Sequence, residues 1–256
     1  RDGTLDLYIA DLGPDQLWMG SPDGTRTDRA EALGVLEPTR WHSGWGPITA
    51  DFDHDGFSDL FLVNTALAYG VEDMQGLAST GAIQTTAEQA DFVLHNRGTA
   101  GFLVTSLPHR PGEGPSIGTG GSAVADVDGD GDLDVAAFYN ATTGLAEGPH
   151  SRTAFRLLRN DTVGQGRWLV VTPHPDGRDP NGTAVELRLN GQRVHRRQVR
   201  TSRGSEGQSW RSLHFGLGEE PSVDEIRIRW PDGTLETRQG PFNTNQALVL
   251  HQALSP

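Results

Sequence analysis

The order of apolar and polar residues along the chain is that of short β-strands separated by turns. Residues 225–230, EIRIRW, alternate charged and apolar side chains, the pattern of a half-buried strand. Tight hairpin turns are expected at 189–192, LNGQ, and at 230–234, WPDGT. Thirty-three glycines and fifteen prolines also fit many turns rather than long helices. The pattern therefore predicts an all-β protein.

One acidic pattern recurs along the first part of the chain. DFDHDGFSDLFLV (51–63) aligns without gaps on DVDGDGDLDVAAF (126–138), and RDGTLDLYIA (1–10) matches its second half. The shared form is D-x-D-x-D-G-x-x-D followed by a short apolar run, which we expect to be a strand. A second segment, expected to form a hairpin, follows each copy, at 15–25, 92–102 and 155–168. Such repetition predicts blades of a β-propeller or another stacked array.

The pattern changes near residue 166, where the acidic loops stop and strand-like segments run between turns. We predict repeats with metal-binding loops over 1–165 and a second all-β domain, a small β-sandwich or barrel, over 166–256. Residues 65–90, rich in Ala, Gln and Glu, are expected to be a loop with one short helix.

The acidic loops have the pattern of calcium sites. Carboxylates at positions 1, 3 and 5 can converge on one cation, the following glycine permits a sharp turn, position 7 offers its carbonyl and position 9 closes the ring. The sequence thus predicts two full Ca²⁺ sites and a third partial one. The predicted ligands are Asp51, Asp53, Asp55, Phe57 and Asp59; Asp126, Asp128, Asp130, Asp132 and Asp134; and Asp2, Thr4 and Asp6.

Two other interpretations of these loops are weaker. An EF-hand needs Glu at position 12, where Leu62 and Ala137 stand, and it needs helices on both sides. Simple acidic turns are common, but two full matches and a half in register with a repeat favour a metal site. Mg²⁺ remains open. His54, at position 4, is expected to point into solvent.

Composition excludes several classes of function. The chain has no cysteine and no lysine, so disulfides, thiol catalysis and lysine chemistry are excluded. A net charge of −13 disfavours nucleic-acid binding, and no apolar run is long enough to cross a membrane. Eleven of the thirty-four acidic residues fall in the three acidic loops, so much of the charge belongs to the predicted metal sites.

Two family resemblances follow from these motifs. The acidic loops resemble the FG-GAP (VCBS) repeats of integrin-α-type propellers. The carboxyl-terminal part resembles the ASPIC/UnbV domain, and the two together resemble bacterial relatives of cartilage acidic protein 1. The motifs that carry the second resemblance are LLRNDTVGQGRWLVV (157–171), NGTAVELRLNGQRV (181–194), HFGLGEE (214–220), VDEIRIRWPDGTLET (223–237) and NQALVL (245–250).

The resemblance implies a calcium-stabilised, non-catalytic scaffold for interactions in the extracellular space or the periplasm and cell envelope. Relatives usually have enough repeats to close a ring, whereas this chain has two full loops and part of a third, a partial ring. We therefore expect a fragment that is completed by upstream blades, or a subunit that docks on other protein chains. Arg1 lies inside a motif, so the true amino terminus is expected to be missing.

Two alternatives involve carbohydrate. Calcium-dependent propellers include polysaccharide lyases and hydrolases, and His42 beside Trp41 and Trp45 could line a sugar-binding face, although packing is favoured there. No Ser-His-Asp order or G-x-S-x-G motif appears, which favours a non-enzyme. The arginine-rich segment with Arg196 and Arg200 could bind anionic glycan, or balance the acidic repeats.

Overall fold

The computed structural model describes residues 4–65, 89–107, 119–140, 153–162, 166–191, 193–200 and 210–253. In these ranges the chain is almost entirely β-strand and turn, with one short helix, α1 (Leu36–Thr39), and one 3₁₀ turn, η1 (Gly98–Ala100). No helix among the described residues is long and apolar enough to cross a bilayer. The short helix expected within 65–90 falls on residues outside these ranges.

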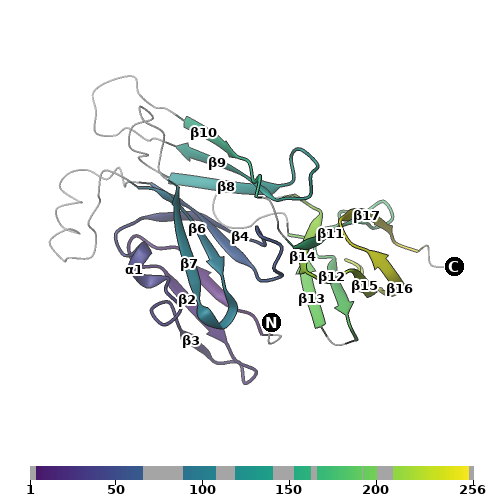
Figure 1. Cartoon of the computed structure of the whole chain (residues 1–256). Helices are drawn as coiled ribbons and strands as arrows, with labels where there is room; N and C mark the ends of the chain where they lie inside the picture. The colour runs from purple at the N-terminus through teal and green to yellow at the C-terminus, as the bar shows by residue number, and fades with distance from the viewer. Residues whose placement is uncertain are drawn as a thin grey trace.

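The acidic repeats form three antiparallel sheets of consecutive strands (Figure 1). Their strands are β1 (Leu7–Ile9), β2 (Gln16–Gly20) and β3 (Arg26–Asp28); β4 (Gly44–Ala50), β5 (Asp59–Asn64), β6 (Asp91–Asn96) and β7 (Phe102–Leu107); and β8 (Thr119–Ala125), β9 (Asp134–Asn140) and β10 (Thr153–Leu158). Each sheet is an up-and-down meander of the kind that propeller blades use.

The sheet of β4 to β7 lies between the other two and is buried on both faces. Every residue of β5 is buried, and its apolar side chains alternate between two separate cores. Phe61 and Val63 pack with Val135 and Ala137 of β9, whereas Leu60 and Leu62 pack in the core that contains Leu17 of β2. Face-to-face stacking of successive sheets is therefore the architecture of this part of the chain.

Buried aspartates lie at two equivalent positions, Asp15 before β2 and Asp91 at the start of β6. The Asp15 carboxylate accepts hydrogen bonds from the Tyr8 hydroxyl and, at 2.8 Å, from the Asp11 amide. The Asp91 carboxylate accepts them from Tyr139 of β9, from Arg156 of β10 at 3.2 Å and from the Asn64 amide at 3.0 Å. Asp91 thus connects the central sheet to the next one.

The third repeat departs from the expected hairpin. The segment after β10 leads into β11 (Arg167–His174), which pairs not with β10 but with two strands near the carboxyl end. The hairpin predicted over 155–168 is therefore wrong in its second strand. The reason is that Leu169 and Val171 enter a different core, so the chain changes sheet at this point.

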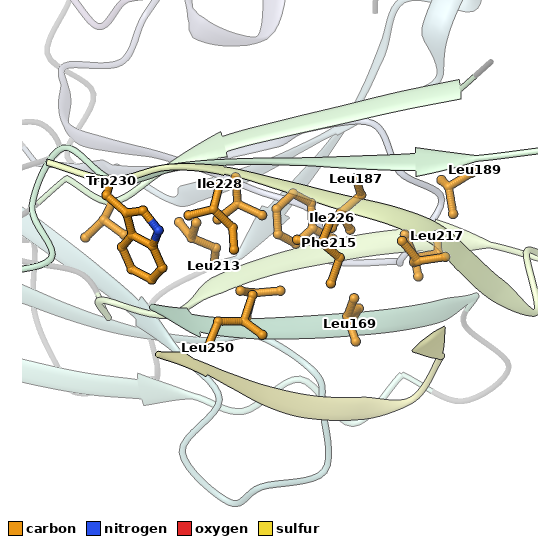
Figure 2. Close-up of a cluster of buried hydrophobic side chains, with 14 residues drawn as sticks. Leu169, Leu187, Leu189, Leu213, Phe215, Leu217, Ile226, Ile228, Trp230 and Leu250 are labelled. Carbon is orange, nitrogen blue, oxygen red and sulfur yellow. The ribbon is translucent and has the colours of Figure 1, made fainter. Parts of the chain in front are cut away.

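The carboxyl-terminal strands form a β-sandwich. One sheet has the order β14 (Leu213–Gly218), β11, β17 (Gln246–His251), and the other has β13 (Arg193–Gln198), β12 (Ala184–Leu189), β15 (Ser222–Arg229), β16 (Leu235–Asn243). Figure 2 shows the core between them, where Trp230 and Phe215 are fully buried. The alternation of 225–230 places Ile226 and Ile228 in this core, as expected of a half-buried strand.

The all-β prediction is confirmed for the described residues, as several small, mostly antiparallel sheets. Among the paired strands of the described residues, β11 and β17 are the exception, because they run parallel. Closure of the three stacked sheets into a propeller ring, and a domain boundary at residues 165–166, stay predictions.

We predict that Asp15→Asn makes stability less dependent on pH. Burial raises the pKa of Asp15 to about 7, well above its value of about 3.9 in an unfolded chain. The folded state therefore holds a proton that the unfolded state has lost. Stability from the neutral group is complete below pH 4 and is lost as the pH rises towards 7.

The amide introduced by Asp15→Asn cannot ionise. The variant should therefore lack the loss of folding free energy that Asp15 causes at rising pH, which is on the order of a few kcal/mol. Urea unfolding at pH 4.5 and pH 8 measures the difference. Asp23→Asn, in an exposed turn, is the matched control and should behave like the wild type. Equal pH dependence in wild type and Asp15→Asn would contradict the prediction.

Candidate metal centre

Both full acidic motifs form the connection of a β-hairpin. Residues 51–58 join β4 to β5, where Ala50 pairs with Asp59, and residues 126–133 join β8 to β9, where Ala125 pairs with Asp134. Gly56 and Gly131 have φ values of 85° and 99°, which side chains other than glycine adopt at a cost. Strands, rather than helices, flank each loop, in agreement with the rejection of an EF-hand.

The loops bring several predicted ligands together. Carboxylate oxygens of Asp51, Asp53 and Asp55 lie within 4.8 Å of one another in the first loop, as do those of Asp126, Asp128 and Asp134 in the second. Asp130 groups with Asp128 and Asp161, and Asp59 with Asp53 and His95. Ligation by the backbone at Phe57 and Asp132 stays a prediction. Asp2 lies outside the described residues.

Asp51 is the most unusual of these groups. Its side chain is 1 % exposed, and neither carboxylate oxygen has a hydrogen-bond partner among the described residues. Burial, together with the neighbouring carboxylates, raises its pKa to about 8, although Arg197 acts in the opposite direction. A buried acid without donors is costly, and a divalent cation is a group that would satisfy it.

The second loop is more open. Asp128 and Asp130 are exposed, and Asp126 is only partly buried. Asp126 also accepts backbone hydrogen bonds from Gly129 at 2.7 Å and Gly131 at 3.1 Å. The two loops therefore share a sequence pattern but differ in solvent access.

The aspartate at position 9 anchors its loop to the next hairpin. Asp59 accepts from the amides of Phe52 and Asn96, each at 2.8 Å, and Asp134 accepts from those of Val127 and Asn160, each at 2.9 Å. In the partial copy, Asp6 accepts from the Gly20 amide at 2.9 Å. Thr4 Oγ1 donates to the Gly20 carbonyl at 3.1 Å. Among the described residues, the bond from a backbone amide beyond the loop to the position-9 aspartate is therefore found three times.

Sequence reasoning missed Asn96 and Asn160, which follow β6 and β10 at equivalent places. The Asn96 side chain donates to the Ser58 carbonyl at 3.0 Å, and that of Asn160 donates to the Phe52 carbonyl at 2.9 Å. Asn160 therefore links the third repeat to the first acidic loop. The repeat alignment contained this signal, because Asn stands five or six residues into both hairpins.

The residue before each of these asparagines approaches the acidic loop. His95 lies with Asp53 and Asp59, whereas Arg159 forms an ion pair with Asp128 at 3.4 Å and another with Asp161. A cation bound in the second loop must compete with the Arg159 guanidinium. The first loop has an imidazole at the equivalent place.

His54 is buried, so the expectation that it points into solvent is wrong. Its Nδ1 donates to the Gly166 carbonyl at 3.2 Å, and its Nε2 lies 3.6 Å from Asp132 of the second loop. Burial lowers the pKa of His54 and also lowers that of the neighbouring His214, to about 3. The cause is long-range packing, because residues from the carboxyl-terminal region cover the loop.

The residues considered for carbohydrate binding have other surroundings. The His42 ring packs edge-on against Phe92 with centroids 4.4 Å apart, while Trp41 is exposed. Arg196 of β13 is exposed and stands opposite Glu186 of β12. Binding of sugar or anionic glycan at these residues stays a prediction.

The donor set fits a hard cation. Clustered carboxylates are oxygen ligands of the kind that Ca²⁺ prefers, at six to eight oxygens per ion. The unpartnered oxygens of Asp51 show that the first loop has free ligand capacity. The groups that would hold the ion there are Asp51, Asp53, Asp55 and Asp59.

Comparison with known proteins agrees with this geometry. The pattern of the FG-GAP-like repeat matches residues 1–62, and the pattern named ASPIC and UnbV matches residues 174–255. FG-GAP repeats typically bind calcium. The first match ends inside β5, so it includes the first acidic loop.

The chain is also similar to cartilage acidic protein 1 from three animals. It is 27% identical over 265 residues to the Mus musculus protein, 28% over 266 residues to that of Xenopus tropicalis and 26% over 265 residues to that of Homo sapiens. Each alignment covers 88% of this chain but only 38% or 39% of the relative. The chain carries an FG-GAP-like repeat followed by an ASPIC and UnbV domain, and it is distantly homologous to cartilage acidic protein 1.

Proposed function

We propose that this chain is a calcium-stabilised, non-catalytic scaffold that presents stacked β-sheets for protein–protein interaction. The observation that carries the proposal is the first acidic loop, where Asp51 is buried beside Asp53 and Asp55 and neither of its oxygens has a partner within the described ranges. A cation at this point would neutralise charges that otherwise repel each other at the end of a hairpin. Its role is then to hold β4 and β5 in place rather than to activate a substrate.

An extracellular, periplasmic or cell-envelope location suits this role. Calcium modules of the extracellular space work with dissociation constants of about 10⁻⁴–10⁻³ M, which open loops with few rigid ligands can reach. The exposure of Asp128 and Asp130 in the second loop is consistent with such a modest affinity.

We predict that EGTA lowers the melting temperature of the protein. A ligand that binds only the folded state at one hundred times its dissociation constant stabilises that state by about 2.7 kcal/mol, which corresponds to roughly 5–10 °C for a chain of this size. Differential scanning calorimetry with and without EGTA measures the shift. Restoration by Ca²⁺ but not by Mg²⁺ identifies the ion.

Asp51→Asn should reduce this response, because it removes the charge of a ligand in the buried loop. Asp23→Asn, an exposed carboxylate outside the loops, should leave it unchanged. An identical melting curve in EGTA and in excess calcium would refute the calcium assignment.

We also predict that Arg159→Ala raises calcium affinity at the second loop by a few-fold. The substitution removes the guanidinium that pairs with Asp128. Isothermal titration in the Asp51→Asn background isolates the second loop. Arg178→Ala is the matched control, since Arg178 pairs with Asp232 in the carboxyl-terminal turn at 230–234. Equal affinities in the two variants would show that Arg159 does not compete.

Apolar side chains are exposed at both ends of the stack of sheets. Leu5, just before β1, is 73% exposed and Leu7 of β1 is 48% exposed; in β10, Phe155 is 68% exposed and Leu157 49%. The opposite faces of these two sheets pack in the cores that they share with the central sheet. We propose that further blades of the same type cover these end faces, either in the same polypeptide or in another chain.

Substitution of the β10 face tests this proposal. Phe155→Thr combined with Leu157→Thr should reduce concentration-dependent association of the 256-residue chain, measured by light scattering after size exclusion. Leu235→Thr, at a position 75% exposed in the sandwich, is the control and should have little effect. A wild-type chain that stays monomeric at all concentrations and binds no hydrophobic dye would argue against uncovered blade faces.

A further inference from the structure

One strand of the carboxyl-terminal sandwich is buried on both faces. All residues of β14 except the last are buried, whereas a strand on the outside of a sandwich buries alternate residues. Leu213, Phe215 and Leu217 enter the sandwich core. His214 and Gly216 point the other way, towards the acidic loops. We call the surface formed by Trp168, His214 and Gly216 the loop-facing side of the sandwich.

Hydrogen bonds join this region to both acidic loops. His214 Nε2 donates to the Gly131 carbonyl of the second loop at 3.0 Å. The Gly218 amide donates to the His54 carbonyl of the first loop at 2.7 Å, and the Gly166 amide donates to the Asp53 carbonyl at 3.4 Å. The backbone of the predicted metal loops is therefore part of the contact with the sandwich.

The close approach depends on glycine on both sides. A Cβ atom at Gly216 would overlap the Asp51 carboxylate and the His54 backbone. A Cβ atom at Gly131 would overlap the indole of Trp168. The sandwich thus covers the loops at a distance that leaves no room for a side chain at these points.

The unpartnered carboxylate lies at this contact. Asp51 lines a small cavity of about 30 Å³ together with Arg197, Trp210 and His214 of the carboxyl-terminal region. A space of this size accommodates a water molecule or two, or a small ion with few waters. Asp51 is 1 % exposed, and Gly216 of the sandwich lies directly against its carboxylate.

We propose that the loop-facing side of the sandwich closes the Asp51 metal site, and that cation binding and seating of the sandwich stabilise each other. The proposal rests on the calcium binding proposed above. A bound cation neutralises the buried carboxylates that the sandwich must cover. The seated sandwich in turn fixes the loop backbone at Asp53 and His54 and excludes water from the ion. Such linkage is reciprocal by thermodynamic necessity.

Gly216→Ala tests the linkage while every ligand residue keeps its identity. Its methyl group would overlap Asp51 and the His54 backbone, so the sandwich could no longer seat against the loop without displacing them. We expect calcium affinity at the first loop, measured by isothermal titration, to fall about tenfold, within the range usual for coupled sites. Gly240→Ala is the matched control. A Cβ there would overlap the carbonyl oxygens of Val223 and Asp224 inside the sandwich, so it strains the same unit away from the loops. Its calcium affinity should equal that of the wild type.

The reciprocal measurement is hydrogen exchange over residues 213–218. Calcium should slow exchange of this segment in the wild type and slow it less in Gly216→Ala. His214→Ala, which removes the bond to the Gly131 carbonyl and the ring contacts with His54 and Trp168, is a second variant if Gly216→Ala does not fold. It should weaken calcium binding in the same direction.

The outcomes separate this inference from the proposed function. Equal calcium affinity in Gly216→Ala or His214→Ala and in Gly240→Ala would overturn the linkage while calcium binding stands. Hydrogen exchange of residues 213–218 at the same rate with and without calcium in the wild type would also overturn the linkage. No calcium binding by the wild type would overturn both proposals.

Discussion

The burial of charge at the first acidic loop is the constraint on which the rest of the structure depends. Asp51 is out of solvent and has no hydrogen-bond donor in the part of the chain that the structure describes, and Asp53 and Asp55 lie beside it. Like charges at this spacing disfavour a compact hairpin unless a cation or a proton neutralises them. The loop joins β4 and β5 of the central sheet, and β5 contributes side chains to both neighbouring cores. Whether the charge of the loop is neutralised therefore affects this sheet.

β5 of the central sheet and β14 of the sandwich are each buried on both faces. β5 sends alternate side chains into two cores, and β14 sends alternate side chains into the sandwich and towards the loops. Displacing a strand that is buried on both faces disrupts the packing on both of its sides. The three stacked sheets, the loops between their strands and the sandwich are thereby connected through a short series of buried strands.

The aspartate at position 9 of each motif also has a structural role, in addition to any role as a metal ligand. Asp59, Asp134 and Asp6 each accept from a backbone amide at or just beyond the end of the following strand, which is β6, β10 and β2 respectively. Such bonds hold a loop relative to its own blade whether or not an ion is bound. Asp6 of the partial copy forms the same bond, with the Gly20 amide.

The sequence alone determined the all-β class, the hairpin position of the acidic loops and the grouping of their carboxylates, because strand alternation and D-x-D-x-D-G spacing are local patterns. It did not determine that His54 is buried, that Asn160 reaches the first loop or that β11 leaves the third repeat. The first two of these features are contacts between residues about 110 positions apart. Only the tertiary structure decided them, since no local pattern specifies which distant backbone covers a loop.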